Sequence, residues 1–395
     1  MYKLHAHYYI FMKIIFWSSL FFILYTYLGY PFWLAFRKKC FLSRNNFEVD
    51  TCELHDIAVV IAVYNEEKNI SKRVVDINRQ NYPQEKLKII VVTDGSTDRT
   101  MDELSKLSFS NLEIISLPEN QGKSMALNVG VAAARSELVI FTDARQAFAP
   151  NAIRNLNDTF ADPNVGCVSG ELVFLQDTES AIREEMGVYW KYEKWIRKTE
   201  SITGSVVGAT GAIYAIRRKL YRTLPQGALL DDVLTPMNIV MQGYRSLLNS
   251  ESIAYDNFSR DVAQEWKRKV RTLAGNWQLL SIAPSLLLPW QNPLWWRFLS
   301  HKIFRLLVPL GLSLFLVASV LAEGFFFEVA MLLQLVVYTV ALLAWLIPTT
   351  RKYKVVKLIY FFVLMNIAVT IGFWKWATGQ CHTVWQPAHK NKQEV

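Results

Sequence analysis

The stretch Ile57-Ala58-Val59-Val60-Ile61-Ala62-Val63, followed by Tyr64-Asn65-Glu66-Glu67, decides the fold. An unbroken apolar run rich in β-branched residues is typical of a strand that is buried on both faces. Such strands belong to parallel sheets, because crossover helices cover both faces of those sheets. The stretch therefore predicts a buried parallel strand in an α/β domain.

The sequence after this strand alternates between helical and extended patterns. A helix is expected over residues 67–79, and the breaker Asn81-Tyr82-Pro83 ends it. Further strands are expected at 87–92, 112–116 and 138–141. Between them, one helix runs to about Lys106, with Ser96 or Thr97 as its cap, and another covers 121–135. This alternation predicts a mostly parallel sheet covered on both faces.

Acidic residues follow the predicted strands. Asp94 and Asp98 come after the second strand, and Asp143 comes after the fourth. Ligands of such sheets bind outside the carboxyl ends of the strands, so these residues are site candidates. A turn or capping role is the alternative for Asp94 and Asp98. The sequence contains neither a GxGxxG nor a GxxxxGK[ST] loop, which argues against dinucleotide oxidoreductases and P-loop ATPases.

Apolar residues make up 52% of the 395 residues and collect at both ends of the chain. One membrane span is expected within residues 7–36, and three more at 304–321, 329–347 and 355–374. A cleaved signal peptide is the alternative for the first, but no small-residue cleavage site follows it. Buried core helices are the alternative for the others, although these lack the polar faces that a soluble core would require.

Basic residues near the span ends predict the orientation. Arg37, Lys38 and Lys39 follow the first span, which places the central domain in the cytoplasm of a multi-pass cell-membrane protein. The expected units are an anchor with its link (1–50), the cytoplasmic domain (51–283), an interfacial amphipathic segment (284–303), and the C-terminal spans with the tail (304–395). Residues 286–298 are expected as one interfacial helix, with a buried core helix as the alternative.

The net charge of +9 is interpreted as a membrane signal rather than a nucleic-acid one. Lysine and arginine cluster beside the spans and in residues 267–271, and no basic stretch interleaved with aromatic residues is present. The four cysteines show no CxxC spacing, so the sequence suggests neither zinc nor a disulfide framework.

A series of motifs runs in order through the central domain: Val63-Tyr64-Asn65-Glu66-Glu67, Thr93-Asp94-Gly95-Ser96-Thr97-Asp98, Asn120-Gln121-Gly122-Lys123-Ser124, Phe141-Thr142-Asp143-Ala144-Arg145, Leu230-Asp231-Asp232, Gly243-Tyr244-Arg245 and Arg268-Lys269-Val270-Arg271. Together they resemble the family 2 inverting glycosyltransferases. The flanking spans make the chain similar to cellulose, hyaluronan and poly-N-acetylglucosamine synthases. The resemblance implies a GT-A fold that uses a nucleotide-diphosphate sugar.

The resemblance also implies roles for the donor-side residues. Tyr64, Glu66 and Asp94 would line the pocket for the nucleotide base and ribose, and Lys123 would approach the diphosphate. A solvated lysine at a helix start is the alternative for Lys123. Departure of the diphosphate builds negative charge, which a divalent cation and cationic side chains can stabilise.

Asp143 would bind Mg²⁺ or Mn²⁺ on the diphosphate, but the second acid of the family's DxD motif is replaced by Arg145. Either Asp143 holds the cation with water and substrate oxygens, or Arg145 supplies part of the positive charge. Magnesium commonly uses only one or two protein carboxylates plus phosphate oxygens, so the replacement leaves a metal site feasible.

Asp232 is expected to be the general base that takes the proton of the attacking hydroxyl. It opens a segment of helical periodicity, residues 233–242. Capping this helix is the alternative role for Asp231 or Asp232, and the pair allows one residue to cap while the other acts as the base.

On the acceptor side, Thr210, Gly211 and Ala212 match a glycine-containing turn of the family. Arg268 and Arg271 share one helix face and could reach the diphosphate, with lipid headgroups as the alternative ligand. Thr272 stands where the family has tryptophan, so Trp277 is a candidate for stacking on the acceptor.

The expected function is transfer of a sugar to a growing polysaccharide or oligosaccharide at the cytoplasmic membrane face. Transfer of one sugar to a lipid or lipid-linked acceptor is an alternative, because the spans contain few polar residues to line a polymer channel. The expected partners are the donor, the glycan or lipid-linked acceptor, membrane lipids, and polysaccharide export components or a second copy of the chain. A catalytically silent scaffold is the alternative from another class.

Overall fold

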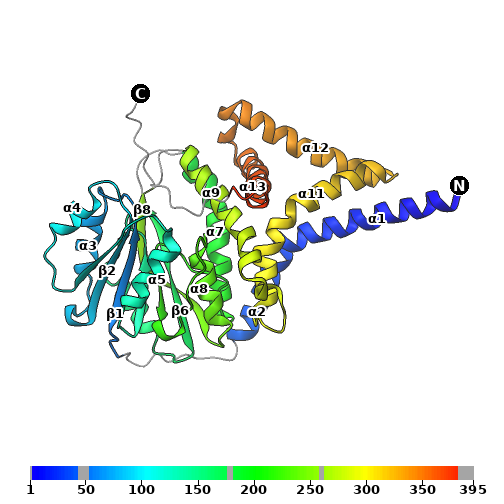
Figure 1. The fold of residues 1–395 in the computed structure, drawn as a ribbon. Helices are drawn as coiled ribbons and strands as arrows, with labels where there is room; N and C mark the ends of the chain where they lie inside the picture. Colours follow the sequence, from blue (N-terminus) through cyan, green and yellow to red (C-terminus); the bar gives the residue numbers. More distant parts are fainter. Residues whose placement is uncertain (1, 43–52, 176–180, 258–261, 381–395) are drawn as a thin grey trace.

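The computed structural model describes residues 2–42, 53–175, 181–257 and 262–380 (Figure 1). The described residues of the soluble domain form one eight-stranded mixed sheet in the order β3-β2-β1-β4-β7-β6-β8-β5. Its strands are β1 (Ile57–Val63), β2 (Leu87–Asp94), β3 (Leu112–Leu117), β4 (Leu138–Thr142), β5 (Ala147–Phe148), β6 (Val165–Leu175), β7 (Tyr214–Arg217) and β8 (Arg245–Asn257).

The first half of the sheet is parallel, as the sequence predicts. β1 lies between β2 and β4 and is parallel to both, and β2 is parallel to β3. Ile57, Val59 and Ile61 pack on one side with α3 (Ile70–Asn78), α4 (Thr100–Ser105) and α6 (Ala152–Thr159). Ala58 and Val60 pack on the other side with α5 (Lys123–Ala133), α8 (Asp231–Val240) and α9 (Val262–Ile282). The apolar run of β1 is therefore buried on both faces.

The second half of the sheet is mixed. β7 runs antiparallel between β4 and β6, β8 is parallel to β6, and β5 is antiparallel to β8. The loop before β7 and the start of α8 therefore lie beside the carboxyl end of β4, where the parallel half ends. Short 3₁₀ segments are η2 (Gln84–Lys86), η3 (Arg218–Leu220), η4 (Pro284–Leu287) and η6 (Pro348–Lys352).

Four helices among the described residues are long and apolar enough to cross a membrane: His7–Cys40, Trp295–Leu321, Phe325–Leu346 and Lys354–Ala377. They match the four predicted spans. The first helix comprises α1 (Tyr2–Leu24), the π-helical turn η1 (Tyr25–Gly29) and α2 (Tyr30–Leu42). The second comprises α10 (Trp295–Phe298), the π-helical turn η5 (Leu299–Ile303) and α11 (Phe304–Leu321). The others are α12 (Phe325–Leu346) and α13 (Lys354–Ala377). α1 runs beside α11, with Phe16 against Phe315 at a ring-centroid distance of 4.7 Å.

Two long helices join the soluble domain to the membrane helices. On α7 (Ala181–Ile202), Ile196 packs against Tyr30 and Leu34 of α2. On α9, Leu273 and Ala274 lie so close to Gly372 of α13 that a Cβ added to this glycine would come within 3.0 Å of the Ala274 nitrogen. Glycine leaves room there for the close approach of the two helix backbones.

Two sequence predictions about local structure are wrong. Residues 286–298 do not form one interfacial helix, because Pro289 and Pro293 interrupt the backbone hydrogen bonds. Leu286 and Phe298 are instead buried in the core of the soluble domain. Neither Ser96 nor Thr97 caps α4. Asp98 accepts a hydrogen bond from the backbone nitrogen of Thr100, two residues on, which is the turn role considered as the alternative for it.

Candidate functional site

A cavity of about 630 Å³ opens beside the carboxyl end of β4. Its walls come from the loop after β4, the start of α5, the loop 207–212, the start of α8, and helices α7 and α9. Its lining includes most of the predicted site residues: Glu66, Lys123, Asp143, Arg145, Thr210, Gly211, Ala212, Asp232, Arg268 and Arg271. The sequence therefore identified residues that the fold brings together from segments far apart in the chain.

An ion pair between α5 and the end of β4 forms one wall of the cavity. The Lys123 ammonium lies 2.9 Å from Asp143 Oδ1 and 3.4 Å from Asp231 Oδ1. Burial by itself raises the pKa of Asp143, but the charges of Lys123 and Arg145 outweigh it and hold that pKa below its ordinary value. Asp143 is therefore a carboxylate at neutral pH, as binding to a cation requires.

Arg145, which replaces the second acid of the metal motif, is also a wall residue. Its guanidinium lies 3.1 Å from Asp256 Oδ2 on β8. Among the residues that the structure describes, no group of three or more histidine, cysteine, aspartate or glutamate side chains could hold a metal ion. Asp143 would thus be the main protein ligand, and phosphate oxygens of a bound substrate would complete the shell, a donor set that suits Mg²⁺.

Asp231 and Asp232 both lie in the first turn of α8, but in different surroundings. Asp231 is buried, accepts a hydrogen bond from the Tyr214 hydroxyl at 3.1 Å, and faces Lys123. The carboxylate of Asp232 has no hydrogen bond or ion pair to any described residue. Neither side chain caps α8, so the capping alternative is not what the structure shows. Asp231 holds the wall together, and Asp232 remains available to a ligand.

The proton affinity of Asp232 suits general-base chemistry. Burial, together with the negative charge of Asp231, raises its pKa to about 6, although Lys123 and Lys302 act in the opposite direction. A base is most effective when its pKa lies near the working pH. The carboxylate also lies beside the acceptor-side turn, since a Cβ added to Gly211 would come within 3.4 Å of Asp232 Oδ2.

Asp94 and Tyr64 are not part of the cavity lining. Asp94 is fully buried, and its two oxygens accept hydrogen bonds of 2.8 Å from the backbone nitrogens of Gln121 and Gly122. These bonds fix the turn that leads into Lys123. In this structure Asp94 supports the cavity wall from behind.

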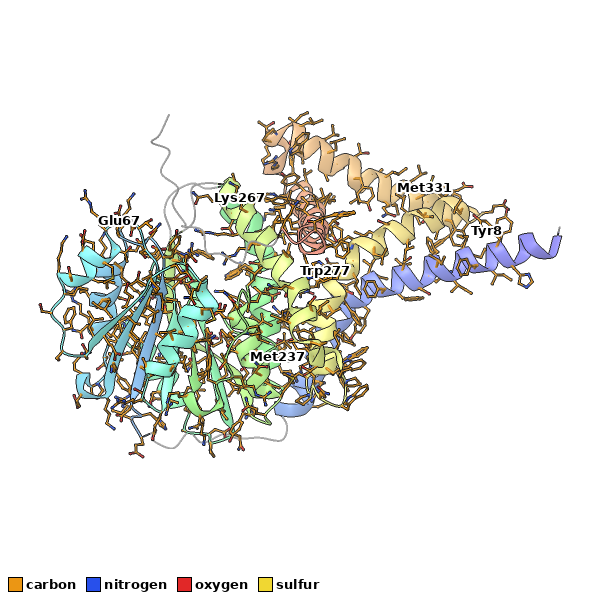
Figure 2. All side chains as sticks on the ribbon, viewed as in Figure 1. Tyr8, Glu67, Met237, Lys267, Trp277 and Met331 are labelled. Carbon is orange, nitrogen blue, oxygen red and sulfur yellow. The ribbon has the colours of Figure 1, made fainter. Side chains whose placement is uncertain are left out.

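Trp277 also lies outside the cavity lining. Its ring stacks on Trp376 of α13 at a centroid distance of 6.0 Å and packs edge-on against Phe373, where α9 meets the membrane helices (Figure 2). The structure thus gives Trp277 a packing role between helices and does not bring it to the acceptor-side turn.

Sequence reasoning missed a second group of lining residues on α7 and η5: Trp190, Glu193, Arg197, Glu200, His301 and Lys302. Arg197 holds the acceptor-side turn through hydrogen bonds to Thr210 Oγ1 at 2.7 Å and Ser169 Oγ at 2.9 Å. A signal was present, because Glu193, Arg197 and Glu200 are spaced to share one helix face, and because His301 and Lys302 directly precede the predicted span 304–321.

Comparisons with known proteins agree with this geometry. Residues 58–224 match the family described as Glycosyl transferase family 2. Poly-beta-1,6-N-acetyl-D-glucosamine synthase of Staphylococcus aureus (strain COL) is 24% identical over 238 residues, which cover 59% of this chain and 57% of that protein. The protein named probable glycosyltransferase YdaM of Bacillus subtilis (strain 168) is 24% identical over 259 residues, covering 63% and 60%. The matches thus span less than two thirds of these relatives.

One solved structure shares the fold over almost the whole chain. Mannosyltransferase PcManGT from Pyrobaculum calidifontis, in complex with GDP-Man and Mn2+, superposes with a TM-score of 0.69 at 21% identity. The superposition covers 93% of this chain and 99% of that one. It confirms the Rossmann-like GT-A fold that the sequence motifs implied, together with the arrangement of apolar helices around it.

Proposed function

Because this chain carries a glycosyltransferase domain of family 2, we propose that it transfers a sugar from a nucleotide-diphosphate sugar to a hydroxyl of a glycan or lipid-linked acceptor, with inversion at C1. The observation that carries this proposal is Asp232, an unpaired carboxylate with a pKa near 6 that shares one cavity with the Lys123–Asp143 pair. The reaction would take place at the cytoplasmic membrane face, in agreement with the basic residues that follow the first span.

The donor would lie along the wall formed by Lys123, Asp143, Arg268 and Arg271. Both arginines are on α9, line the cavity and act electrostatically on Asp143. Their positive charges would stabilise the negative charge that develops on the leaving diphosphate. A divalent cation held by Asp143 would supply further positive charge at the same place, as a Lewis acid on the diphosphate oxygens.

In the transfer step, the acceptor oxygen forms a bond to C1 of the sugar as the bond from C1 to the diphosphate oxygen breaks. The proton of the acceptor hydroxyl moves to Asp232, and the bonding electrons leave with the nucleoside diphosphate. A single in-line displacement of this kind inverts the configuration at C1. Asp232 lies beside Gly211, where a small residue leaves room for the acceptor.

Similarity to the Staphylococcus aureus synthase supports a role in exopolysaccharide or cell-surface glycan synthesis. A second candidate, transfer of one sugar to a lipid-linked acceptor, is favoured by the spans, because Gln334 and Asn366 are their only buried amide side chains among the described residues. A polymer channel through one copy of the chain would require a more polar lining.

The test is transfer by membranes containing the protein from a panel of radiolabelled UDP- and GDP-sugars, with and without EDTA. Wild-type protein should give a labelled glycan or glycolipid whose size separates polymer from single transfer. D232N should lose at least a hundredfold in rate, because the base is removed. D102N, which changes an exposed carboxylate on α4, is the matched control and should keep full activity. Equal activity of D232N and wild type would reject this mechanism.

A further inference from the structure

The cavity continues past Asp232 to the place where the second span begins. This part, here called the α7 arm, is lined by Trp190, Glu193, Arg197, Glu200, His301 and Lys302. It adjoins the acceptor-side turn, since Arg197 contacts Thr210 and Asp232 lies beside Gly211. An acceptor whose hydroxyl reaches Asp232 would therefore occupy this arm.

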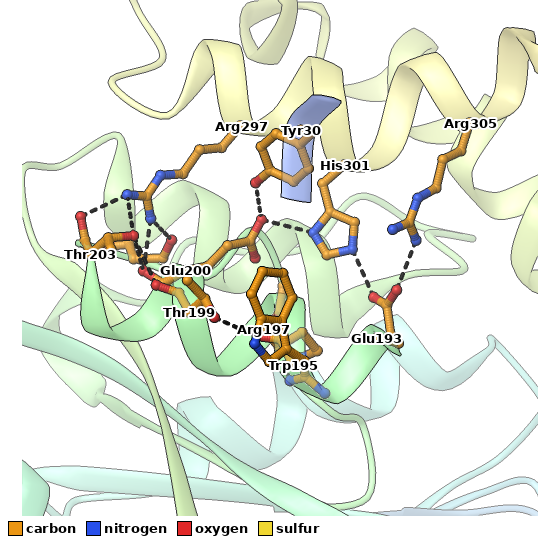
Figure 3. Close-up of polar contacts among 12 residues, drawn as sticks. Tyr30, Glu193, Trp195, Arg197, Thr199, Glu200, Thr203, Arg297, His301 and Arg305 are labelled. Atoms are coloured by element: carbon orange, nitrogen blue, oxygen red, sulfur yellow. Dashed lines mark hydrogen bonds and ion pairs between the residues drawn. The ribbon is translucent and has the colours of Figure 1, made fainter. Parts of the chain in front are cut away.

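A buried network fixes the walls of the arm (Figure 3). His301 lies between two carboxylates, with Nδ1 at 2.9 Å from Glu200 and Nε2 at 2.7 Å from Glu193. Arg305 donates to the second oxygen of Glu193 at 2.7 Å, and the Tyr30 hydroxyl donates to Glu200. Since an ionised carboxylate only accepts, two carboxylates on the two ring nitrogens favour the imidazolium form of His301. The two glutamates are thus already paired with cations of the protein.

Lys302 differs from the other charged residues of the arm. It lines the cavity, yet it makes no hydrogen bond or ion pair within the part of the chain that the structure describes. It is attracted by Glu193 and Asp232 at longer range, while the guanidinium groups of Arg197 and Arg305 add positive potential around it. A partly buried ammonium without a partner is unfavourable, and an anionic ligand would relieve this.

One oxygen of Glu200 is the second unsatisfied group. Glu200 is fully buried and lines the arm, but its Oε2 has no hydrogen-bond partner among the described residues. A carboxylate oxygen of this kind is satisfied by a hydroxyl that donates to it. The arm therefore presents one site for an anion and one for a hydroxyl donor, a combination typical of a phosphorylated sugar.

The cations that would hold the donor diphosphate form a separate group. Arg268 and Arg271 interact electrostatically with Asp143, to which Lys123 is hydrogen-bonded. The charge of Asp232 is coupled both to Lys123 and to Lys302. Asp232 therefore interacts electrostatically with a cation of each group, and only the first group is assigned to the donor diphosphate.

Lys302 also lies where a lipid would arrive. It belongs to η5, the π-helical turn inside the apolar helix Trp295–Leu321. Turns of this type occur frequently at functional sites. Arg297 anchors the start of the same helix by donating to the carbonyl oxygens of Glu200, Thr203 and Ser205 at the end of α7. The anion site is thus fixed at the junction of the soluble domain and the membrane helices.

We propose that the acceptor is a sugar linked to a lipid through phosphate, with a sugar hydroxyl at Asp232 and Glu200 and the phosphate at Lys302. This inference rests on the proposed glycosyl transfer and names its acceptor class. It predicts that Lys302 discriminates between phosphorylated and neutral acceptors that carry the same sugar.

The test uses purified full-length protein in detergent and a matched pair of acceptors: a farnesyl-diphosphate-linked sugar and the uncharged farnesyl glycoside of the same sugar. K302M should lower kcat/KM for the phosphorylated acceptor tenfold or more, as expected for loss of a charge-assisted hydrogen bond. The factor by which kcat/KM falls should be at least five times larger for the phosphorylated acceptor than for the neutral one. K302R should retain most of the preference. K354M, which removes an exposed cation beside the fourth span, should behave as wild type.

Each outcome has a distinct meaning. Equal losses of K302M on both acceptors, or no loss on either, would overturn the assignment of the phosphate to Lys302. A wild-type preference for a soluble oligosaccharide over both lipids would overturn the acceptor class while leaving glycosyl transfer intact. Absence of transfer by wild type to every acceptor, with donor binding retained, would instead contradict the proposed function. Inhibition by free inorganic phosphate that K302M abolishes, without any preference for the phosphorylated lipid, would identify a free anion as the ligand. K302Q replaces K302M if the methionine variant does not fold.

Discussion

The raised pKa of Asp232 predicts how the transfer rate depends on pH. The group must be ionised to accept a proton, so activity should fall as the pH decreases through the pKa of about 6. With that value, the ratio of ionised to protonated Asp232 is about ten to one at pH 7 and about one to ten at pH 5. The kcat/KM should therefore drop roughly tenfold between these two values.

Two substitutions should move the pH at which activity falls by half, and they should move it in opposite directions. Asp231 raises the pKa of Asp232, so D231N should shift the midpoint to lower pH; Lys302 lowers it, so K302M should shift the midpoint upward. The assay is the initial rate at subsaturating acceptor from pH 4.5 to 8 at constant ionic strength, with recovery of activity after return to pH 7 as the control for acid damage. A midpoint near 4, or shifts in the same direction for both variants, would refute the reasoning.

Three further predictions concern stability and metal use. R297M should lower the free energy of unfolding by roughly 2 kcal/mol and the melting temperature by about 4–8 °C, because three carbonyl oxygens at the end of α7 lose their donor. A thermal melt in detergent measures the change. An unchanged melting temperature would contradict the anchoring role of Arg297. G170A should lower the free energy of unfolding by about 1–3 kcal/mol, since the added Cβ would lie 2.4 Å from the Ser252 carbonyl oxygen. At Gly243 an added Cβ would meet nothing within 4 Å, but φ is +91°, so G243A should act through backbone strain alone. EDTA should reduce transfer at least tenfold, with recovery on adding Mg²⁺ or Mn²⁺; full activity in EDTA would mean that Lys123 and Arg145 stabilise the diphosphate without a metal ion.

The parallel half of the fold was predictable because each strand is a short apolar run with both faces buried. Ile57–Val63 and Leu138–Thr142 lie where the sequence predicts them. The mixed half was not predicted. β6 buries only its first part, most of β8 is half-buried, and β7 has only four residues, so their patterns are weak until the neighbouring strands are known.

The site shows a similar division. Lys123, Asp143 and Asp232 were found because each occurs in a short motif, and the fold brings all three to one cavity. Asp231 is hydrogen-bonded to Tyr214, whereas burial raises the pKa of Asp232. Motif spacing does not reveal this difference in surroundings. His301 was missed because its partners lie on α7, about a hundred residues earlier in the chain, and Lys302 because only the fold brings it to the cavity.

The anchoring of α7 by Arg297 has a consequence for dissecting the protein. A fragment ending at Ala283, where the soluble domain was expected to stop, would lack the guanidinium that covers the end of α7 and the turn that supplies His301 and Lys302. Glu193 and Glu200 would then be two carboxylates without the cationic side chains of His301 and Arg305 that face them. The membrane-embedded part therefore completes the cavity, and excision at this boundary should yield a domain in which the α7 side of the cavity is open and misfolded.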